Sequence, residues 1–144
     1  MNERRVFPAD RRQVGEVRRF IAACAEAAEM SDVLPDLLIA ASEAAANAIL
    51  HSGTREFRVI WRSTEDLVEI TVEDDGMFVD RVPLPEIDGI AHRGISLMAA
   101  AMDELSLVEG RIGRPGTRVK MVRVLPTAEL IPPGLGRPSS RLAG

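Results

Sequence analysis

The stretch that decides the fold is LIAASEAAANAILH, residues 38–51, which is rich in strong helix formers. It is apolar on every side except at Glu43, Asn47 and His51, which are spaced four residues apart. Residues four apart advance about 40° around a helix and about 6 Å along it, so these three side chains form one rising polar row. A helix that is apolar all round is normally buried, and an unpartnered buried polar group costs about 1–3 kcal/mol. The polar row is therefore expected to face something polar.

Helical and strand patterns continue on both sides of this helix and predict the element order βααββαββ. Upstream, residues 4–8 fit an edge strand, and Asp10 fits the cap of a helix over residues 11–30. Pro35 suits the first turn of the helix that carries the polar row, and this helix is expected to end near residues 52–53. Downstream, the pattern predicts a hairpin over residues 56–62 and 67–72, a long loop over 76–92 and a short helix over 95–102. Two further strands are predicted over residues 105–108 and 117–124.

The length and composition fit a single domain. A chain of 144 residues buries a sizeable core, so we expect one domain over residues 1–125 and a flexible tail rich in Pro, Gly, Ser and Arg over residues 126–144. No apolar run is expected to reach the length of about 18 residues that a membrane span requires, and the charged N-terminus does not resemble a secretion signal. These features predict a cytoplasmic protein with no membrane partner.

The charge distribution points away from nucleic acid. The formal net charge is −4, and the basic residues are scattered along the chain without interleaved aromatics, so no direct nucleic-acid partner is expected. Almost all basic residues are arginines, and several arginines on one surface would suit an acidic protein partner.

Two residues that often carry chemistry are expected to be structural. Cys24 is the single cysteine and lies in an alanine-rich segment, so it is expected to be a small buried hydrophobe. Trp61 lies in a strand pattern without a basic groove beside it, so it is expected to pack in the core or on a sheet face.

The polar row is the first of four short signatures whose order fits the binding of Mg-ATP. Mg²⁺ prefers oxygen ligands and usually takes only one or two from a protein, so the side-chain oxygen of Asn47 suffices. Glu43, one turn earlier, can accept a proton from an attacking hydroxyl. The competing interpretation is an alanine-rich packing helix with one hydrated stripe.

The second signature is the acidic strand end Val72-Glu73-Asp74-Asp75-Gly76. A carboxylate held there can accept the exocyclic amine of adenine, whereas guanine presents an acceptor at that position and is rejected. Such a bond is worth about 1.5–3 kcal/mol, and the glycine lets the base approach the backbone. The competing interpretation is an ordinary polar turn, because Asp-Gly pairs are common in turns.

The third and fourth signatures are a helix opening and a strand start. In Arg93-Gly94-Ile95-Ser96, free backbone N–H groups and the helix dipole can hold phosphate, and Arg93 or His92 can add a donor. In Gly116-Thr117, the threonine hydroxyl can join Asp74 through water at the adenine edge. Each motif alone also fits an ordinary junction between elements.

Together, in this order and spacing, the four signatures resemble the ATP-binding domain of the GHKL superfamily, and within it the stand-alone anti-sigma-factor kinases. The resemblance covers about residues 6–124. It implies the Bergerat-type fold, an α+β two-layer sandwich with helices on one face of a mixed, mostly antiparallel sheet. It also implies an ATP lid over residues 77–93. The roles it implies are general base for Glu43, Mg²⁺ ligand for Asn47, adenine acceptor for Asp74, close approach of base or phosphate at Gly76 and Gly94, and part of the adenine pocket for Thr117.

Two positions depart from the family pattern. Phe78 stands where the acidic motif normally has a second glycine, and Ser96 stands where the helix-opening motif has one. Both changes add a side chain beside the expected nucleotide. Ser96 can still offer its N–H and a hydroxyl, whereas Phe78 is expected to reshape the hinge of the lid.

The resemblance implies a serine/threonine protein kinase and anti-sigma factor. Such a protein binds a sigma factor and phosphorylates an anti-anti-sigma antagonist, and homodimerisation is a further expectation. The alternative is a nucleotide-binding regulatory module that holds its partner without phosphoryl transfer, which Phe78 and Ser96 favour. The catalytic domain of a sensor histidine kinase is disfavoured because no membrane span or histidine-bearing dimerisation hairpin is expected. A DNA-topology or chaperone ATPase would need further domains.

Overall fold

Two long helices and five strands make up the described part of the chain. The structure is a computed structural model and describes residues 1–51, 53, 55–76, 96–108 and 116–126, without the side chain of His51. The elements are β1 (Asn2–Pro8), α1 (Gln13–Ala27), the 3₁₀ turn η1 (Ser31–Val33), α2 (Leu34–His51), β2 (Glu56–Ser63), β3 (Leu67–Asp74), β4 (Glu104–Val108) and β5 (Thr117–Val124). Residues 96–101 are also helical and precede β4. The predicted order βααββαββ is therefore confirmed.

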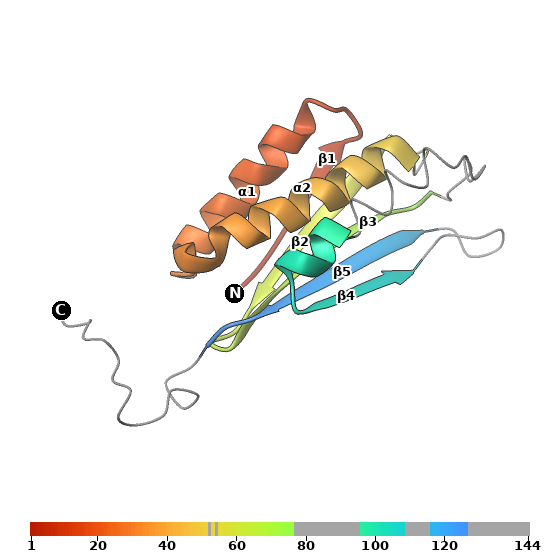
Figure 1. The fold of residues 1–144 in the computed structure, drawn as a ribbon. Coiled ribbons are helices and arrows are strands. Elements are labelled where there is room, and N and C mark those ends of the chain that lie inside the picture. The colour runs from red at the N-terminus through yellow and green to blue at the C-terminus, as the bar shows by residue number, and fades with distance from the viewer. Residues whose placement is uncertain (52, 54, 77–95, 109–115, 127–144) are drawn as a thin grey trace, which may run out of the picture.

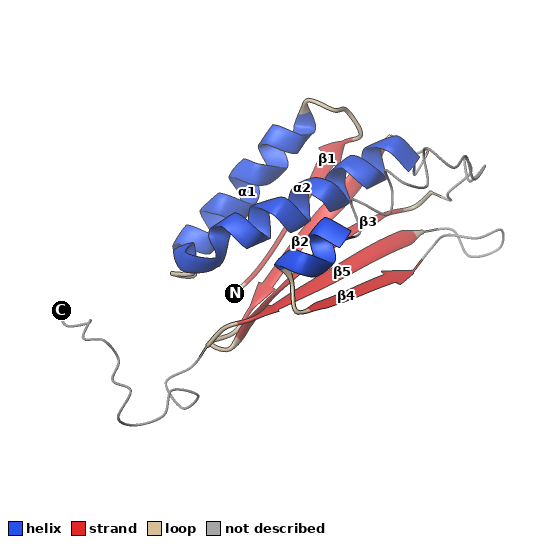
Figure 2. Cartoon of the chain, viewed as in Figure 1, coloured by secondary structure: helices blue, strands red, loops and turns tan. Residues whose placement is uncertain are grey.

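The five strands form one sheet in the order β1-β2-β3-β5-β4. All four described pairings are antiparallel, so the sheet contains no parallel pair in the part that the structure describes. The helices lie together on one face of this sheet (Figures 1 and 2). The expected two-layer α+β sandwich is confirmed, whereas the expected mixed sheet is antiparallel in every described pair. β5 lies between β3 and β4, so the strand order departs from the order along the chain.

The inner face of the sheet carries the core because the strands alternate with a period of two. In β2, Phe57, Val59 and Trp61 are fully buried, whereas Arg58 and Arg62 point to the outer face. The indole N–H of Trp61 donates to Ser63 Oγ at 3.0 Å, which satisfies the ring's one donor. The expected structural role of Trp61 is confirmed.

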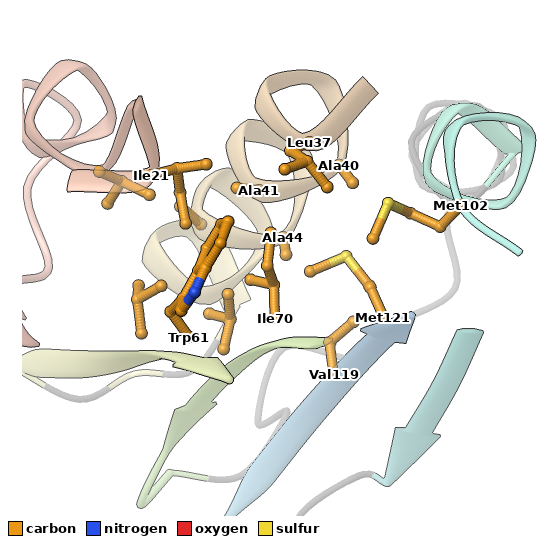
Figure 3. Close-up of a cluster of buried hydrophobic side chains, with 14 of the residues drawn as sticks. Ile21, Leu37, Ala40, Ala41, Ala44, Trp61, Ile70, Met102, Val119 and Met121 are labelled. Atoms are coloured by element: carbon orange, nitrogen blue, oxygen red, sulfur yellow. The ribbon is translucent and has the colours of Figure 1, made fainter. Parts of the chain in front are cut away.

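Helix α2 packs on the sheet through small side chains. Its buried positions include Ala40, Ala41, Ala44, Ala45 and Ala48. Figure 3 shows α2 above the sheet, with the residues Ala40, Ala41 and Ala44 near Trp61, Ile70 and Met121. Alanines at these positions leave little side chain between the helix backbone and the sheet, so the backbone of α2 lies close to β3 and β5.

The composition of this helix corrects one expectation. Residues Ser31–Leu50 are long and apolar enough to cross a membrane by length and composition. The same apolar character belongs to a core helix, and the alanines of α2 are buried against the sheet. The length of an apolar run therefore does not by itself distinguish a membrane span from a buried core helix here.

Helix α1 is shorter at both ends than the predicted span of residues 11–30. Asp10 accepts the Arg12 N–H at 2.9 Å, but it does not cap the helix, which begins at Gln13. At the other end, Met30 N–H donates to Ala25 C=O and Glu29 N–H to Glu26 C=O, at 2.8 and 3.1 Å. This is a Schellman ending with Glu29, at φ 59°, in the left-handed position that glycine usually fills. Because no glycine occurs at this helix end, the sequence pattern predicted that the helix ends at residue 30, three residues after the observed end at Ala27.

Candidate functional site

The polar row lies on one flank of α2. On the opposite flank, Arg18 of α1 donates to Ser42 Oγ at 2.8 Å. Helical spacing puts Glu43 and Asn47 on the other side of the buried alanines from Ser42, and Figure 3 shows helix 96–101 on the side of α2 away from α1. Both side chains are partly buried, and neither forms a hydrogen bond with another described residue.

The C-terminal half of α2 reaches the same end of the sheet as Asp74. Asp36, at the start of α2, meets Arg123 at 3.1 Å, and Arg123 pairs with Val68 near the start of β3. From that level, Asn47 lies about 16 Å further along α2, because a helix rises about 1.5 Å per residue. Asp74 lies about 20 Å further along β3, because a strand rises about 3.3 Å per residue. The fold therefore brings the polar row and the acidic strand end to one edge of the molecule.

Asp74 is buried at that edge without a cation. Its exposed fraction is 3 %, and it is one of three buried polar residues among those described. Its Oδ1 accepts the Gly76 N–H at 2.8 Å, and its carboxylate also accepts the backbone N–H of Thr117. No described Arg, Lys or His forms an ion pair with it. Two carboxylate oxygens offer about four lone-pair positions, so acceptor capacity is left over.

The burial of Asp74 changes its acidity. Desolvation raises the pKa of Asp74 above its ordinary value, and the N–H groups of Gly76 and Thr117 offset only part of that rise. A buried carboxylate held by main-chain donors and lacking a counter-ion is a strong candidate for a ligand contact. A donor from a ligand, such as an exocyclic amine, would stabilise its charged form.

Two glycines shape the corner around Asp74. Gly116 N–H donates to Gly76 C=O at 2.8 Å, which continues the contact between the two chain segments past the Asp74–Thr117 pair. Gly116 has φ +116°, a conformation that side-chain-bearing residues rarely adopt, and a Cβ there would lie 3.4 Å from the Asp74 carbonyl oxygen. The corner thus depends on a glycine at position 116.

The neighbours of Asp74 point to the other face of the sheet. Arg58 of β2 donates to Glu73 at 3.0 Å and holds Asp75 through two bonds, at 3.1 and 3.2 Å. These bonds raise the pKa of Arg58 and lower that of Asp75. Of the three acidic residues in the run, only Asp74 faces the helices. The strand alternation carried this information. Arg58 is the contributor that the sequence interpretation missed, and Gly116 was recognised only as part of the strand start at Thr117.

The predicted site residues fall into two groups. The structure places Asp74, Gly76 and Thr117 in one buried corner, joined by main-chain hydrogen bonds, and Glu43 and Asn47 on the neighbouring flank of α2. Thr117 is 6 % exposed and its backbone N–H donates to the Asp74 carboxylate, and the expected link of its hydroxyl to Asp74 through water stays a prediction. Ser96 is exposed at the start of the described helix 96–101. Outside the described residues lie the predicted lid 77–93, which contains Phe78 and His92, together with Arg93, Gly94 and the side chain of His51.

The donor set suits a metal ion that arrives with its ligand. No three His, Cys, Asp or Glu residues gather into a metal-binding group in the described ranges. The polar row instead offers the amide oxygen of Asn47 and the carboxylate of Glu43 on successive turns of α2. Oxygen ligands suit Mg²⁺, which in nucleotide sites takes most of its ligands from phosphate and water. The residues present therefore fit a nucleotide-bound Mg²⁺.

Comparison with known proteins identifies the family. A family model described as the histidine kinase-like ATPase domain matches residues 7–123, about four-fifths of the chain. No curated protein matches the sequence. The matched span includes α2, the end of β3 and the start of β5, which carry the described site residues. The family implies that the chain binds ATP. The chain belongs to the histidine kinase-like ATPase domain family.

Proposed function

We propose that this protein is a serine/threonine protein kinase and anti-sigma factor. It binds Mg-ATP, sequesters a sigma factor and phosphorylates an anti-anti-sigma antagonist on a hydroxyl side chain. The observation that carries the nucleotide part of this proposal is the buried carboxylate of Asp74, which has main-chain donors but no counter-ion among the described residues. The kinase and sigma-factor parts rest on the sequence resemblance.

The adenine end of the site is assigned to Asp74 and Thr117. The remaining lone pairs of the Asp74 carboxylate accept the exocyclic amine of adenine, and Gly76 and Gly116 keep side chains out of this corner. A charge-assisted bond of this kind is worth about 1.5–3 kcal/mol. Guanine, with a carbonyl at the same position, would set acceptor against acceptor, so ATP is preferred over GTP.

The phosphate end is assigned to α2 and the chain segment that leads into helix 96–101. The side-chain oxygen of Asn47 would hold the Mg²⁺, which neutralises charge on the phosphates when bound. Glu43, one turn earlier, accepts the proton of the attacking serine or threonine hydroxyl as its oxygen bonds to the γ-phosphorus and ADP leaves. Arg93, Gly94, Ser96 and His92 are proposed phosphate contacts, and His51 is proposed to line the nucleotide site.

The partners follow from the same resemblance. We expect a sigma factor and an anti-anti-sigma protein as protein partners, a possible homodimer, and a cytoplasmic location. Neither nucleic acid nor a membrane is expected to bind directly. The alternative function is a nucleotide-binding regulatory module that holds its partner without phosphoryl transfer. The observation that favours the alternative is the exposed Ser96, which adds a side chain where the family motif has glycine.

Calorimetric titration with Mg-ATP and Mg-GTP tests the nucleotide site. We expect ATP to bind at least about tenfold more tightly than GTP, and Asn47→Ala to weaken Mg-ATP by about tenfold. Without Mg²⁺, Asn47→Ala should change the affinity for ATP much less. Equal affinities for the two nucleotides would remove the assignment of Asp74.

Incubation with labelled ATP and a candidate antagonist that carries an acceptor serine tests the kinase. Label should appear on the antagonist with the wild-type chain and be strongly reduced with Glu43→Ala, although ATP affinity is retained. Binding of both ATP and antagonist without any label transfer would favour the regulatory module. Undiminished transfer by Glu43→Ala would leave Glu43 without a role as base.

A further inference from the structure

Arg123 of β5 lies at the end of the sheet opposite Asp74 and contacts two separate elements. One terminal nitrogen, Nη2, donates to Asp36 Oδ2 in the first turn of α2 at 3.1 Å. The other, Nη1, donates to Asp103 Oδ2, just after helix 96–101, at 3.5 Å. Asp36 and Arg123 are 87 residues apart in sequence. A single guanidinium thus joins α2, β5 and the end of the short helix.

Asp103 is itself fixed to the sheet. Its carboxylate accepts the Val124 N–H at 2.6 Å, and its own N–H donates to Val122 C=O at 2.7 Å. The end of helix 96–101 is therefore anchored to β5 by main-chain bonds, and Arg123 adds the link to α2. Asp36 and Asp103 have side chains that are 40 % and 43 % exposed, whereas that of Arg123 is 28 % exposed.

The position of Arg123 is maintained at a cost. Its Nε is buried and has no hydrogen-bond partner among the residues that the structure describes. Leaving a buried donor unpaired is unfavourable, and an apolar side chain of similar length at this inner-face position would avoid it. The two ion pairs of Arg123 are partly exposed, and exposed pairs contribute only about 0–1 kcal/mol to stability. Stability alone therefore does not account for an arginine here.

The geometry relates Arg123 to the two sides of the nucleotide site. Helix 96–101 ends near this guanidinium, and α2 begins near it. The chain therefore runs toward Arg123 in the short helix and away from it in α2. Glu43 lies seven residues from Asp36, about 10 Å along α2, and Ser96 lies at the opposite end of helix 96–101 from Asp103. Arg123 thus joins the two helices at the ends that are remote from Ser96 and Glu43.

We propose that Arg123 is a positioning residue that sets the distance between α2 and helix 96–101, and with it the fit of the triphosphate. This inference rests on the proposed nucleotide site, in which Glu43 and Asn47 lie on one side of the phosphates and Ser96 on the other. Arg123 does not touch the nucleotide. The adenine corner of Asp74 and Thr117 is built from β3 and β5 alone and does not depend on the spacing of the helices.

The test compares ATP with adenosine, because adenosine uses only the adenine corner. Arg123→Met should lower the affinity for Mg-ATP by about tenfold or more while the affinity for adenosine stays within about twofold, both measured by calorimetry. Its urea midpoint should equal or exceed that of the wild type, because the apolar side chain removes the unpaired Nε. Arg62→Met is the matched control: its partner Glu69 lies across the outer face at 3.5 Å, and both affinities should be unchanged.

A second variant keeps the test independent of folding. Asp36→Asn is nearly isosteric and weakens only the link to α2, so it should lower Mg-ATP affinity by about threefold and leave adenosine unchanged. Equal losses for both ligands, or no loss for ATP in either variant, would overturn the positioning role. If the wild type binds adenosine but not Mg-ATP, the proposed phosphate site fails, and this result is distinct from a failure of the role of Arg123.

Discussion

The charged side chains near the two ends of β5 differ in whether the fold supplies a partner of opposite charge. At one end, Arg123 meets the carboxylates of Asp36 and Asp103, so its charge is balanced within the fold. At the other end, Asp74 lies buried beside Thr117 with main-chain N–H groups as its partners and no described cation in contact. The two residues lie on the same face of the same sheet, because Asp74 pairs with Thr117 and Arg123 lies six residues after Thr117 in β5. The charge of Arg123 is neutralised by carboxylates of the fold, whereas the charge of Asp74 has no described counter-ion and is available to a ligand.

The largest expected effect on ATP affinity is at Asp74, whose charge has no described counter-ion. Asp74→Asn keeps the shape of the side chain but turns one acceptor into an NH₂ donor, which would face the Thr117 N–H or the adenine amine. We expect ATP affinity to fall by about a hundredfold, equivalent to about 2.7 kcal/mol. Titration calorimetry measures this change. Retained affinity would mean that the unmatched charge is not the adenine contact, and the contrast between the two ends would lose its functional meaning.

A substitution at Gly116 tests whether this glycine holds the corner around Asp74 in place. Gly116→Ala forces a side chain into φ +116° and places its Cβ 3.4 Å from the Asp74 carbonyl oxygen. We expect a loss of about 1–2 kcal/mol in the free energy of unfolding, with a weaker affinity for ATP. Gly15→Ala is the control, because nothing lies within 4 Å of its Cβ in helix α1, and it should stabilise the fold by about 0.5 kcal/mol. Urea titration of both variants compares them, and similar signs for the two would contradict the strained corner.

The acidity of Asp74 predicts a dependence on pH. Because burial raises its pKa, the folded state holds its proton more tightly than the unfolded state does. The ionised carboxylate therefore costs stability as pH rises from the unfolded pKa, about 3.9, through the raised folded pKa, and the cost is constant above it. Asp74→Asn should remove this cost. ATP affinity has the opposite trend: it should fall severalfold as pH decreases from about 7 through the raised pKa, because the protonated group loses acceptors.

Calorimetry across this pH range, repeated with Asp74→Asn, isolates the contribution of Asp74. The wild type should lose affinity on acidification, and the variant should show a flatter profile. An identical profile in the two proteins would assign the titration to another group.

The smallest expected effect is at Cys24, which belongs neither to the Asp74 corner nor to the contacts of Arg123. Cys24 of α1 is 4 % exposed, and burial raises the pKa of its thiol to about 11. It should react with a thiol reagent far more slowly in the folded than in the unfolded protein, because the thiolate is the reactive form. Cys24→Ala should leave ATP affinity unchanged. Fast modification without unfolding would contradict the buried placement.

The local features of the fold were readable from the sequence. The helix with the polar row, the hairpin of β2 and β3, and the start of β5 at Thr117 all follow from periodicity and lie within two residues of the predicted bounds. The flank of α2 that carries Glu43 and Asn47 followed from their spacing. Errors arose where the usual signal was missing, as at Glu29, which ends α1 in the left-handed conformation without a glycine.

The strand order and the matching of charges were not readable in the same way. β5 pairs with β3 on one side and β4 on the other, a choice that depends on how the whole sheet buries its inner face. The contact between Arg123 and Asp36 spans 87 residues and has no local pattern. Arg58 likewise holds Asp75 across two strands, and this leaves Asp74 alone among its acidic neighbours to face the helices.

The sequence by itself determined which elements form and which residue types they carry, because periodicity, turns and helix propensity act over a few neighbouring residues. Only the tertiary structure decided which charges are neutralised and which are left for a ligand. Burial and ion pairing depend on residues that are distant in the chain and meet only when the sheet and helices assemble. The motif singled out Asp74, but only the fold shows that Asp74 lacks a described counter-ion while Arg123 has two carboxylate partners.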